Sequence, residues 1–146
     1  MRKTVLLIDD DRLPIEYYVR ALEQKGFEVK QCFGPDSALE FAAKKLSEIC
    51  AIVLDIMMPP GRKYESIDTH EGLITGLFLL DSLRRHCPDM PVVVLTNVRN
   101  PKTLDKLKDK PLVEIVQKMD YPPFEFADLV DKRVRESNHM DAAKES

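Results

Sequence analysis

The sequence contains no tryptophan, only three cysteines and no long hydrophobic run among its 146 residues. Without tryptophan, and with few tyrosines, the chain lacks the usual aromatic platforms on which single-stranded nucleic acids stack. No apolar stretch approaches the roughly 20 residues that a membrane-spanning helix needs. Lysine and arginine form no run, and 22 basic against 25 acidic residues give a net charge of −3. We therefore expect neither nucleic acid nor an anionic membrane as a partner.

The three cysteines are widely spaced and odd in number. Cys32, Cys50 and Cys87 form no CxxC pair, and no histidine stands at metal-ligand spacing from them. This pattern argues against a disulfide framework and against a zinc site, and favours buried thiols.

The length of the chain fits one compact domain, because most domains have roughly 100–150 residues. The first residues lead straight into a short apolar run and lack the cleavage region of a signal peptide, which favours a cytoplasmic protein.

Short apolar runs alternate with segments of helical periodicity. The runs at residues 4–8, 51–54 and 91–95 are rich in valine, isoleucine and leucine, as is typical of strands buried on both faces. Weaker patterns predict an outer strand at 27–33 and a fifth strand at 113–117. Strands joined by helices pair in parallel through right-handed crossovers. We therefore predict an α/β fold in which helices cover both faces of an open, five-stranded parallel sheet.

The predicted helices have recognisable beginnings and ends. The first begins at Asp11, which can cap it, and stops at Gly26. The last begins near Pro123 and presents an apolar face that ends at Val134. We expect the polar residues 137–146 to form a frayed tail.

Polar side chains end four of the five predicted strands. They are the Asp9–Asp10 pair, Asp55, Thr96 and Lys118. Ligands of open parallel sheets bind beyond the carboxyl ends of the strands, so we expect these side chains to meet. Each of them alone is a weak signal, since a strand-end aspartate is usually a helix cap and a lysine there is usually solvated. The set is specific because its members share one edge of the sheet.

The chemistry of this set favours phosphoryl transfer. Two like charges about 4 Å apart repel by roughly 4 kcal/mol at an effective dielectric constant of about 20. Mg²⁺ or Mn²⁺ would offset this repulsion. A cation, an ammonium and a hydroxyl can cradle phosphoryl oxygens while a carboxylate acts as the nucleophile. Asp55 suits that role because it stands alone after a middle strand, opposite the aspartate pair.

The strings VLLIDDD, IVLDIMMPP, PVVVLTN and IVQK occur in this order and resemble the receiver domain of two-component response regulators. The resemblance covers about residues 3–136 and implies a flavodoxin-like, chemotaxis-type fold with strand order 2-1-3-4-5. It predicts a receiver domain over 1–136, followed by the tail of 137–146.

The resemblance also implies roles for individual residues. Asp55 is the expected phosphoacceptor. Mg²⁺ is expected to be bound directly by Asp10, through water by Asp9, and also by Asp55 and the backbone carbonyl of Met57. Thr96 is expected to move toward the phosphoryl group.

In the family pattern Lys118 pairs with the phosphoryl group. A histidine kinase or a histidine phosphotransfer protein is the expected donor. We expect a stand-alone regulator, monomeric or dimerising on phosphorylation, that signals by protein contact and catalyses at most its own phosphotransfer and dephosphorylation.

One departure from the receiver pattern is an insertion after the third strand. Receivers usually have a glycine about eight residues after the acceptor, whereas Gly76 follows Asp55 by 21 residues. About 13 residues are thus inserted within 60–75, which we call the insert. It carries Arg62, Lys63, Tyr64, His70 and Glu71. Two interpretations stay open: a long mobile loop, or a contact for a partner or phosphodonor.

Three further departures lie near the expected site. Met119 follows Lys118, where the family has a proline with a cis peptide bond; a cis bond before another residue costs roughly 3–4 kcal/mol. Either this bond is trans and Lys118 approaches the site differently, or a strained cis bond is retained for function. Ile115 replaces the aromatic residue that rotates inward when Thr96 moves, which predicts a muted or rerouted signal there. Asn97 replaces the small residue that the family usually has after the threonine, which predicts narrower access of phosphodonors to Asp55.

Two other functions remain open at this point. The first is a pseudo-receiver, an interaction module with absent or vestigial phosphorylation, which Met119 and Ile115 favour. The second is a metal-dependent phosphohydrolase on a similar sheet. Such enzymes usually carry a second aspartate two residues beyond the nucleophile, where this chain has Met57.

Overall fold

The computed structural model describes residues 3–145, apart from the side chains of 12–14 and 141–145. Its strands form one parallel sheet in the order β2-β1-β3-β4-β5, which confirms the predicted fold. The strands are β1 (Thr4–Ile8), β2 (Glu28–Cys32), β3 (Ile49–Leu54), β4 (Val92–Thr96) and β5 (Val113–Gln117). The helices are α1 (Arg12–Gln24), α2 (Pro35–Lys45), η1 (Leu46–Glu48), α3 (Thr75–His86), α4 (Pro101–Lys108) and α5 (Pro123–Glu145).

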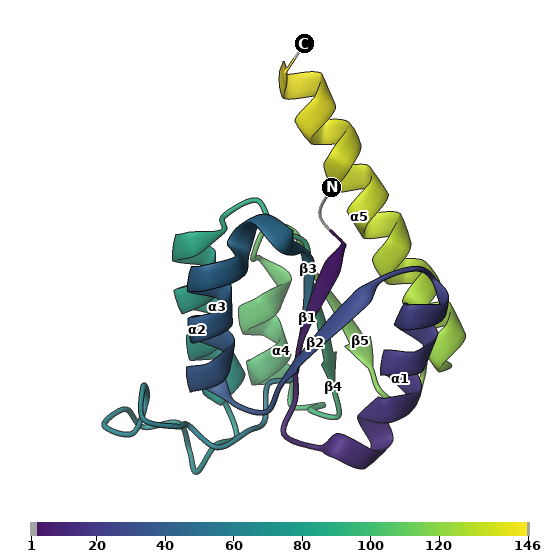
Figure 1. Cartoon of the computed structure of the whole chain (residues 1–146). Coiled ribbons are helices and arrows are strands. Elements are labelled where there is room, and N and C mark those ends of the chain that lie inside the picture. The colour runs from purple at the N-terminus through teal and green to yellow at the C-terminus, as the bar shows by residue number, and fades with distance from the viewer. Residues whose placement is uncertain (1–2, 146) are drawn as a thin grey trace.

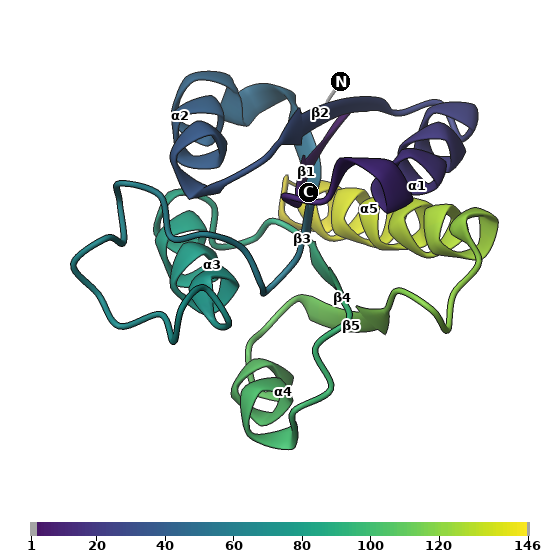
Figure 2. The same cartoon turned by 90° about the horizontal axis from the view of Figure 1, so that it is seen from below.

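The helices form a layer on each face of the sheet. Figure 2 shows α1 and α5 on one face and α2, α3 and α4 on the other. Alternate side chains of a strand point to opposite faces, so Leu6 and Ile8 of β1 pack on the α2–α4 side while Val5 and Leu7 pack on the α1–α5 side. This double burial explains why the inner strands consist almost wholly of apolar residues.

The expectation of a frayed tail is wrong for the backbone of residues 137–145. Helix α5 continues to Glu145, and Figure 1 shows its last turns projecting beyond the sheet. The segment contains neither proline nor glycine and includes alanine, methionine, lysine and glutamate, which favour helix. A polar composition thus marks the end of core contact and not the end of the helix.

All three cysteines are buried, as expected. In the part of the chain that the structure describes, no helix is both long and apolar enough to cross a membrane.

Arg84 connects the end of α3 to the segments that enter β4 and β5. Its guanidinium donates hydrogen bonds to the carbonyls of Met90, Pro88 (3.3 Å) and Pro111 (2.8 Å). Hydrogen bonds from a charged donor contribute more than neutral ones, roughly 1.5–3 kcal/mol. One side chain therefore fixes two loops at the amino-terminal edge of the sheet.

Replacement of Arg84 by methionine keeps most of the apolar stem but leaves these carbonyls without their donor. We expect Arg84→Met to lower the free energy of unfolding by about 2–3 kcal/mol in urea denaturation followed by circular dichroism. The neighbouring Arg85 is exposed, so Arg85→Met is the matched control and should change stability by less than about 0.5 kcal/mol. Equal unfolding midpoints for the two variants would contradict this assignment.

Candidate functional site

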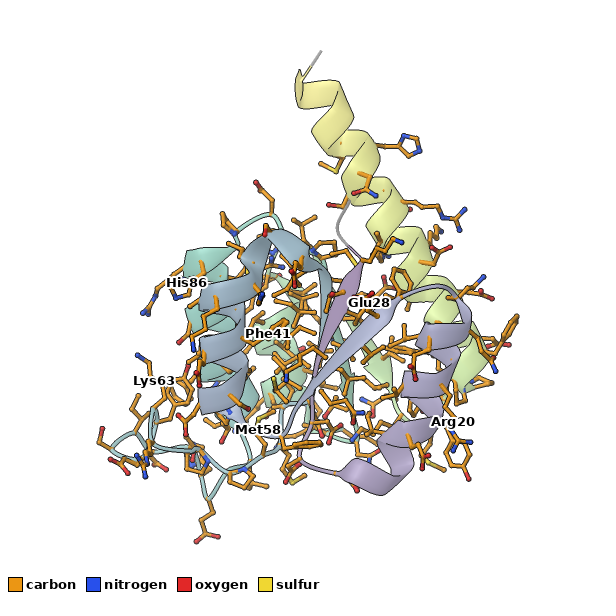
Figure 3. All side chains as sticks on the ribbon, viewed as in Figure 1. Arg20, Glu28, Phe41, Met58, Lys63 and His86 are labelled. Atoms are coloured by element: carbon orange, nitrogen blue, oxygen red, sulfur yellow. The ribbon has the colours of Figure 1, made fainter. Side chains whose placement is uncertain are left out.

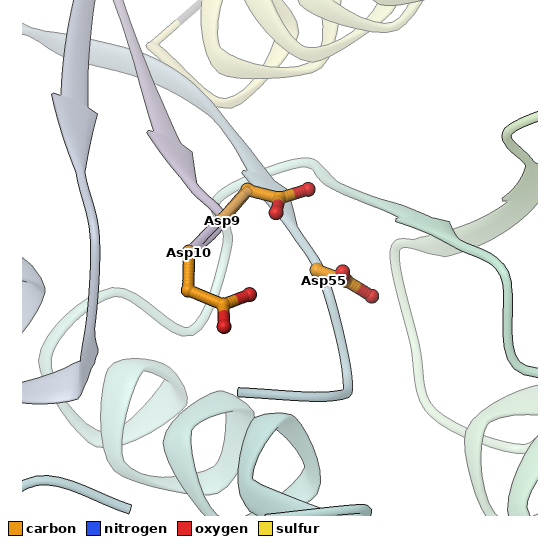
Figure 4. Close-up of side chains that lie close together, drawn as sticks. All are labelled: Asp9, Asp10 and Asp55. Atoms are coloured by element: carbon orange, nitrogen blue, oxygen red, sulfur yellow. The ribbon is translucent and has the colours of Figure 1, made fainter. Parts of the chain in front are cut away.

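Three carboxylates meet at the carboxyl edge of the sheet, as the sequence predicts. Oxygen atoms of Asp9, Asp10 and Asp55 all lie within 4.8 Å of one another (Figure 4). Asp9 directly follows β1 and Asp55 directly follows β3, the neighbouring strand. The Asp55 amide donates to the carbonyl of Ile8 at 3.0 Å, which continues the strand pairing into the site. Asp9 and Asp55 are buried, whereas Asp10 is exposed.

Lys118 lies between the two buried carboxylates. Its Nζ is 2.8 Å from Asp9 Oδ2 and 3.1 Å from Asp55 Oδ2. The other oxygen of each carboxylate accepts a backbone hydrogen bond: Asp9 Oδ1 from the Asp11 amide at 2.9 Å, and Asp55 Oδ1 from the Ile56 amide at 2.7 Å. Both carboxylates are therefore held in fixed orientations.

Burial governs the proton affinities in this cluster. It raises the pKa of Asp9 to about 6, and the nearby charge of Asp55 adds to the rise, while Lys118 and the Asp11 amide offset part of it. Burial alone lowers the pKa of Lys118, but the attraction of Asp9 and Asp55 outweighs burial and leaves that pKa above its ordinary value. Lys118 thus stays charged at neutral pH.

The donor set fits a hard divalent cation. Three carboxylates and one ammonium leave an excess of negative charge in a small volume. The charge of Asp55 adds to the rise in the pKa of Asp9 that burial causes. Oxygen ligands are those that Mg²⁺ prefers. Asp9, Asp10 and Asp55 would hold such a cation, which supplies charge neutralisation to phosphoryl oxygens when bound. That the backbone carbonyl of Met57 also binds the cation stays a prediction.

Thr96 lies beside this cluster without sharing its hydrogen bonds. It ends β4 and is fully buried, and its hydroxyl accepts the Val98 amide at 3.1 Å. Its carbonyl accepts the Lys118 amide at 3.0 Å, so the backbone joins the two residues. The expected movement of Thr96 stays a prediction.

Gly76 allows the start of α3 to approach Asp55 closely. Its amide donates to the Ile56 carbonyl at 2.8 Å, and a Cβ at this position would lie 2.5 Å from the Asp55 carbonyl oxygen. Any side chain here would overlap the backbone that carries Asp55. The close contact supplies the physical reason for a glycine at this point, despite the insertion that precedes it.

The first half of the insert is anchored on α2 and α3. The Asp36 carboxylate accepts the amides of Arg62 and Lys63 at 2.8 and 2.9 Å. The Tyr64 side chain is buried, and its hydroxyl contacts the Ser82 hydroxyl. In Figure 3 the labelled Lys63 lies on the α2–α3 side of the molecule.

The second half of the insert returns to the site. The Met58 amide donates to the Gly72 carbonyl at 3.0 Å. His70 and Glu71 are exposed and adopt positive φ angles of 52° and 60°. The insert is thus tied both to the helices and to the strand end that carries Asp55.

Two residues of this region could not be identified from sequence. The helical spacing of apolar residues predicts that Tyr18 belongs to the buried face of the first helix. In the structure its hydroxyl donates a hydrogen bond to the carbonyl of Lys118. Asp36 lies in the first turn of α2, yet its carboxylate anchors the insert. Neither partner is close in sequence, so the periodicity of the chain contains no signal for these contacts.

The structure shows the bond and the side chains at the three positions near the site that differ from the receiver pattern. Among the described residues no peptide bond is cis, so the Lys118–Met119 bond is trans, and the Met119 side chain is 84 % exposed. Lys118 nevertheless reaches both carboxylates. Ile115 is half-buried and packs on the α2–α4 side of the sheet. Asn97 is exposed.

The raised pKa of Asp9 makes the metal-free protein less stable as the pH rises. The folded state binds this proton more tightly than the unfolded chain, whose ordinary pKa is 3.8. The corresponding stabilisation, roughly 3 kcal/mol at most, is present below about pH 4 and is lost as the pH rises through about 6. In EDTA we expect Asp9→Asn to flatten the stability profile between pH 4 and 7 and to raise stability at pH 7.5 by about 1–2 kcal/mol.

Chemical denaturation at a series of pH values measures this effect. The control is Asp68→Asn, because the carboxylate of Asp68 in the insert is 82 % exposed and should contribute little to the profile. If Asp9→Asn and the wild type show the same dependence of unfolding free energy on pH, the proposed effect of the Asp9 charge is refuted.

Comparisons with known proteins agree with this geometry. Residues 5–132 match the family model described as the response regulator receiver domain. The chain is 29 % identical over 93 residues to the probable transcriptional regulatory protein TcrX of Mycobacterium tuberculosis, and 32 % identical over 96 residues to the response regulator MprA of Mycobacterium ulcerans. These matches cover 64 % and 66 % of this chain but only 33 % and 35 % of the relatives, so the chain spans about a third of their length.

Solved structures share the fold of this chain. A CheY-like response regulator receiver domain protein from Methanospirillum hungatei aligns with a TM-score of 0.78 at 17 % identity, covering 96 % of this chain and 99 % of that structure. The chain belongs to the response regulator receiver domain family.

Proposed function

We propose that the chain accepts a phosphoryl group on Asp55, with Mg²⁺ or Mn²⁺, as a response regulator of a two-component or phosphorelay system. The observation that carries this proposal is the position of Lys118, whose ammonium lies 3.1 Å from the Asp55 carboxylate within a cluster of three aspartates. The donor would be a histidine kinase or a histidine phosphotransfer protein.

In the proposed reaction a carboxylate oxygen of Asp55 attacks the phosphorus of the donor. An O–P bond forms as the N–P bond of the phosphohistidine breaks, and the imidazole leaves with the electron pair and takes up a proton from water. Lys118 contributes positive charge to the phosphoryl oxygens as the new bond forms. The hydrogen bond from the Ile56 amide to Oδ1 fixes the orientation of the carboxylate.

Phosphorylation of Asp55 would be transmitted through the neighbouring loops. The phosphorylated Asp55 would carry roughly −1.5 to −2 charges where the free carboxylate carries −1, and this change would bias two arrangements of Thr96. Gln117 Nε2 donates to the Val98 carbonyl at 2.8 Å, which links the loop after Thr96 to the end of β5. Because Ile115 offers no aromatic ring, we propose that the response there is muted or rerouted. We also propose that the exposed side chains of the insert, among them Lys63 and His70, are a contact for the partner or phosphodonor, whereas the buried Tyr64 anchors the insert and is not part of that contact.

A pseudo-receiver that binds partners without phosphorylation is the second candidate function. The exposed Met119 and the non-aromatic Ile115 favour it. The buried carboxylates with their lysine weigh against it, because a buried charged cluster is costly to maintain without use.

Labelling with radioactive acetyl phosphate in the presence of Mg²⁺ tests the proposal. We expect stable incorporation into the wild type, and incorporation at least tenfold lower in Asp55→Asn or when EDTA replaces Mg²⁺. Asp120→Asn is the matched control, because this exposed aspartate follows Lys118 by two residues and should not affect labelling.

Other results of the labelling experiment would favour the pseudo-receiver or the phosphohydrolase. Absence of label from acetyl phosphate and also from a panel of phosphorylated histidine kinases would favour the pseudo-receiver. Continuous release of phosphate with turnover would instead indicate a phosphohydrolase.

A further inference from the structure

The backbone of Lys118 is held from two sides. Its amide donates to the Thr96 carbonyl at 3.0 Å, and its own carbonyl accepts the hydroxyl of Tyr18. The next side chain, Met119, is 84 % exposed and therefore provides little packing. The Tyr18 hydroxyl is thus the contact that ties the residue to the α1 side of the molecule.

Tyr18 is itself rigidly placed. It lies on α1 and is 7 % exposed, and its ring meets the Phe126 ring edge-on, with centroids 5.3 Å apart and an interplanar angle of 88°. The hydroxyl also lies 3.3 Å from the Tyr121 carbonyl, so it bridges the two ends of the loop that follows β5. A ring fixed by α5 therefore holds the loop that carries Lys118.

The hydroxyl remains a hydrogen-bond donor at neutral pH. Burial raises the pKa of Tyr18, although the nearby charge of Lys118 offsets part of the rise. A protonated phenol donates one hydrogen bond, and the carbonyl that accepts it is buried. Phenylalanine at this position would keep the ring and lose only this donor.

We propose that Tyr18 is a positioning residue: its hydroxyl fixes the Lys118 backbone and so keeps the ammonium on the Asp55 carboxylate. The kinetic consequence of this inference rests on the proposed phosphorylation of Asp55, whereas the position of the ammonium does not. Small displacements of a reacting or charge-stabilising group reduce rates strongly, because the rate depends on its geometry in the transition state.

The chain offers two matched controls for removal of this hydroxyl. Tyr17 is the adjacent residue and is 66 % exposed. Tyr64 is buried, and its hydroxyl contacts Ser82 and the Phe78 carbonyl, away from Lys118. A general effect of losing a buried tyrosine hydroxyl would therefore appear in Tyr64→Phe as well.

We expect Tyr18→Phe to lower the maximal rate of phosphorylation by acetyl phosphate about tenfold, with little change in the concentration of acetyl phosphate that gives half the maximal rate. Tyr17→Phe and Tyr64→Phe should stay within twofold of the wild type. In a Lys118→Met background, Tyr18→Phe should cause no further loss, because the hydroxyl acts through the lysine.

The NMR signal of the Lys118 Nζ in metal-free protein tests the inference independently of phosphorylation. It should shift in Tyr18→Phe and stay unchanged in the two controls. If the wild type is not phosphorylated, the proposed function fails while this signal still decides the positioning role. An unchanged Lys118 signal, or equal losses of rate in the wild-type and Lys118→Met backgrounds, would overturn the inference.

Discussion

The ion pairs of Lys118 with Asp9 and Asp55 are the contacts on which the candidate site depends. Two buried carboxylates and a third exposed one repel, and water cannot screen the buried pair. A single ammonium offsets only part of this repulsion, and burial together with the charge of Asp55 still raises the pKa of Asp9 to about 6. The site therefore has an excess of negative charge that suits a divalent cation and, with it, a phosphoryl group.

The backbone around these charges allows Asp9 and Asp55, and the start of α3, to approach one another closely. Parallel pairing of β1 with β3 places Asp9 and Asp55 side by side, and Gly76 lets α3 begin against the Asp55 carbonyl where a Cβ would clash. The insert of residues 60–75 leaves and returns around this contact without disturbing it. Tyr18 holds the Lys118 backbone from the opposite face of the sheet. The charged side chains of the site are thus rigidly placed, and the insert adds a surface beside them.

Sequence reasoning predicted most of the fold because apolar runs and the polar residues that end them are local signals. The convergence of Asp9, Asp10, Asp55 and Lys118 followed from the parallel topology and from the resemblance to receivers. Contacts between distant segments could not be predicted. Asp36 binds amides 26 and 27 residues away, and Tyr18 binds a carbonyl 100 residues away. The sequence does not indicate the full length of α5, because polar residues end core packing without ending a helix.

We propose that Asp55, the neighbouring aspartates and Lys118 together form a phosphoryl-accepting site. Beryllofluoride imitates a phosphoryl group bound to a carboxylate, so its binding followed by ¹⁹F NMR tests the site without any kinase or turnover. We expect protein-bound fluoride signals in the wild type with Mg²⁺, and their loss in Asp55→Asn or without a divalent cation. Bound signals that persist in Asp55→Asn, or their absence from the wild type at saturating Mg²⁺, would contradict it.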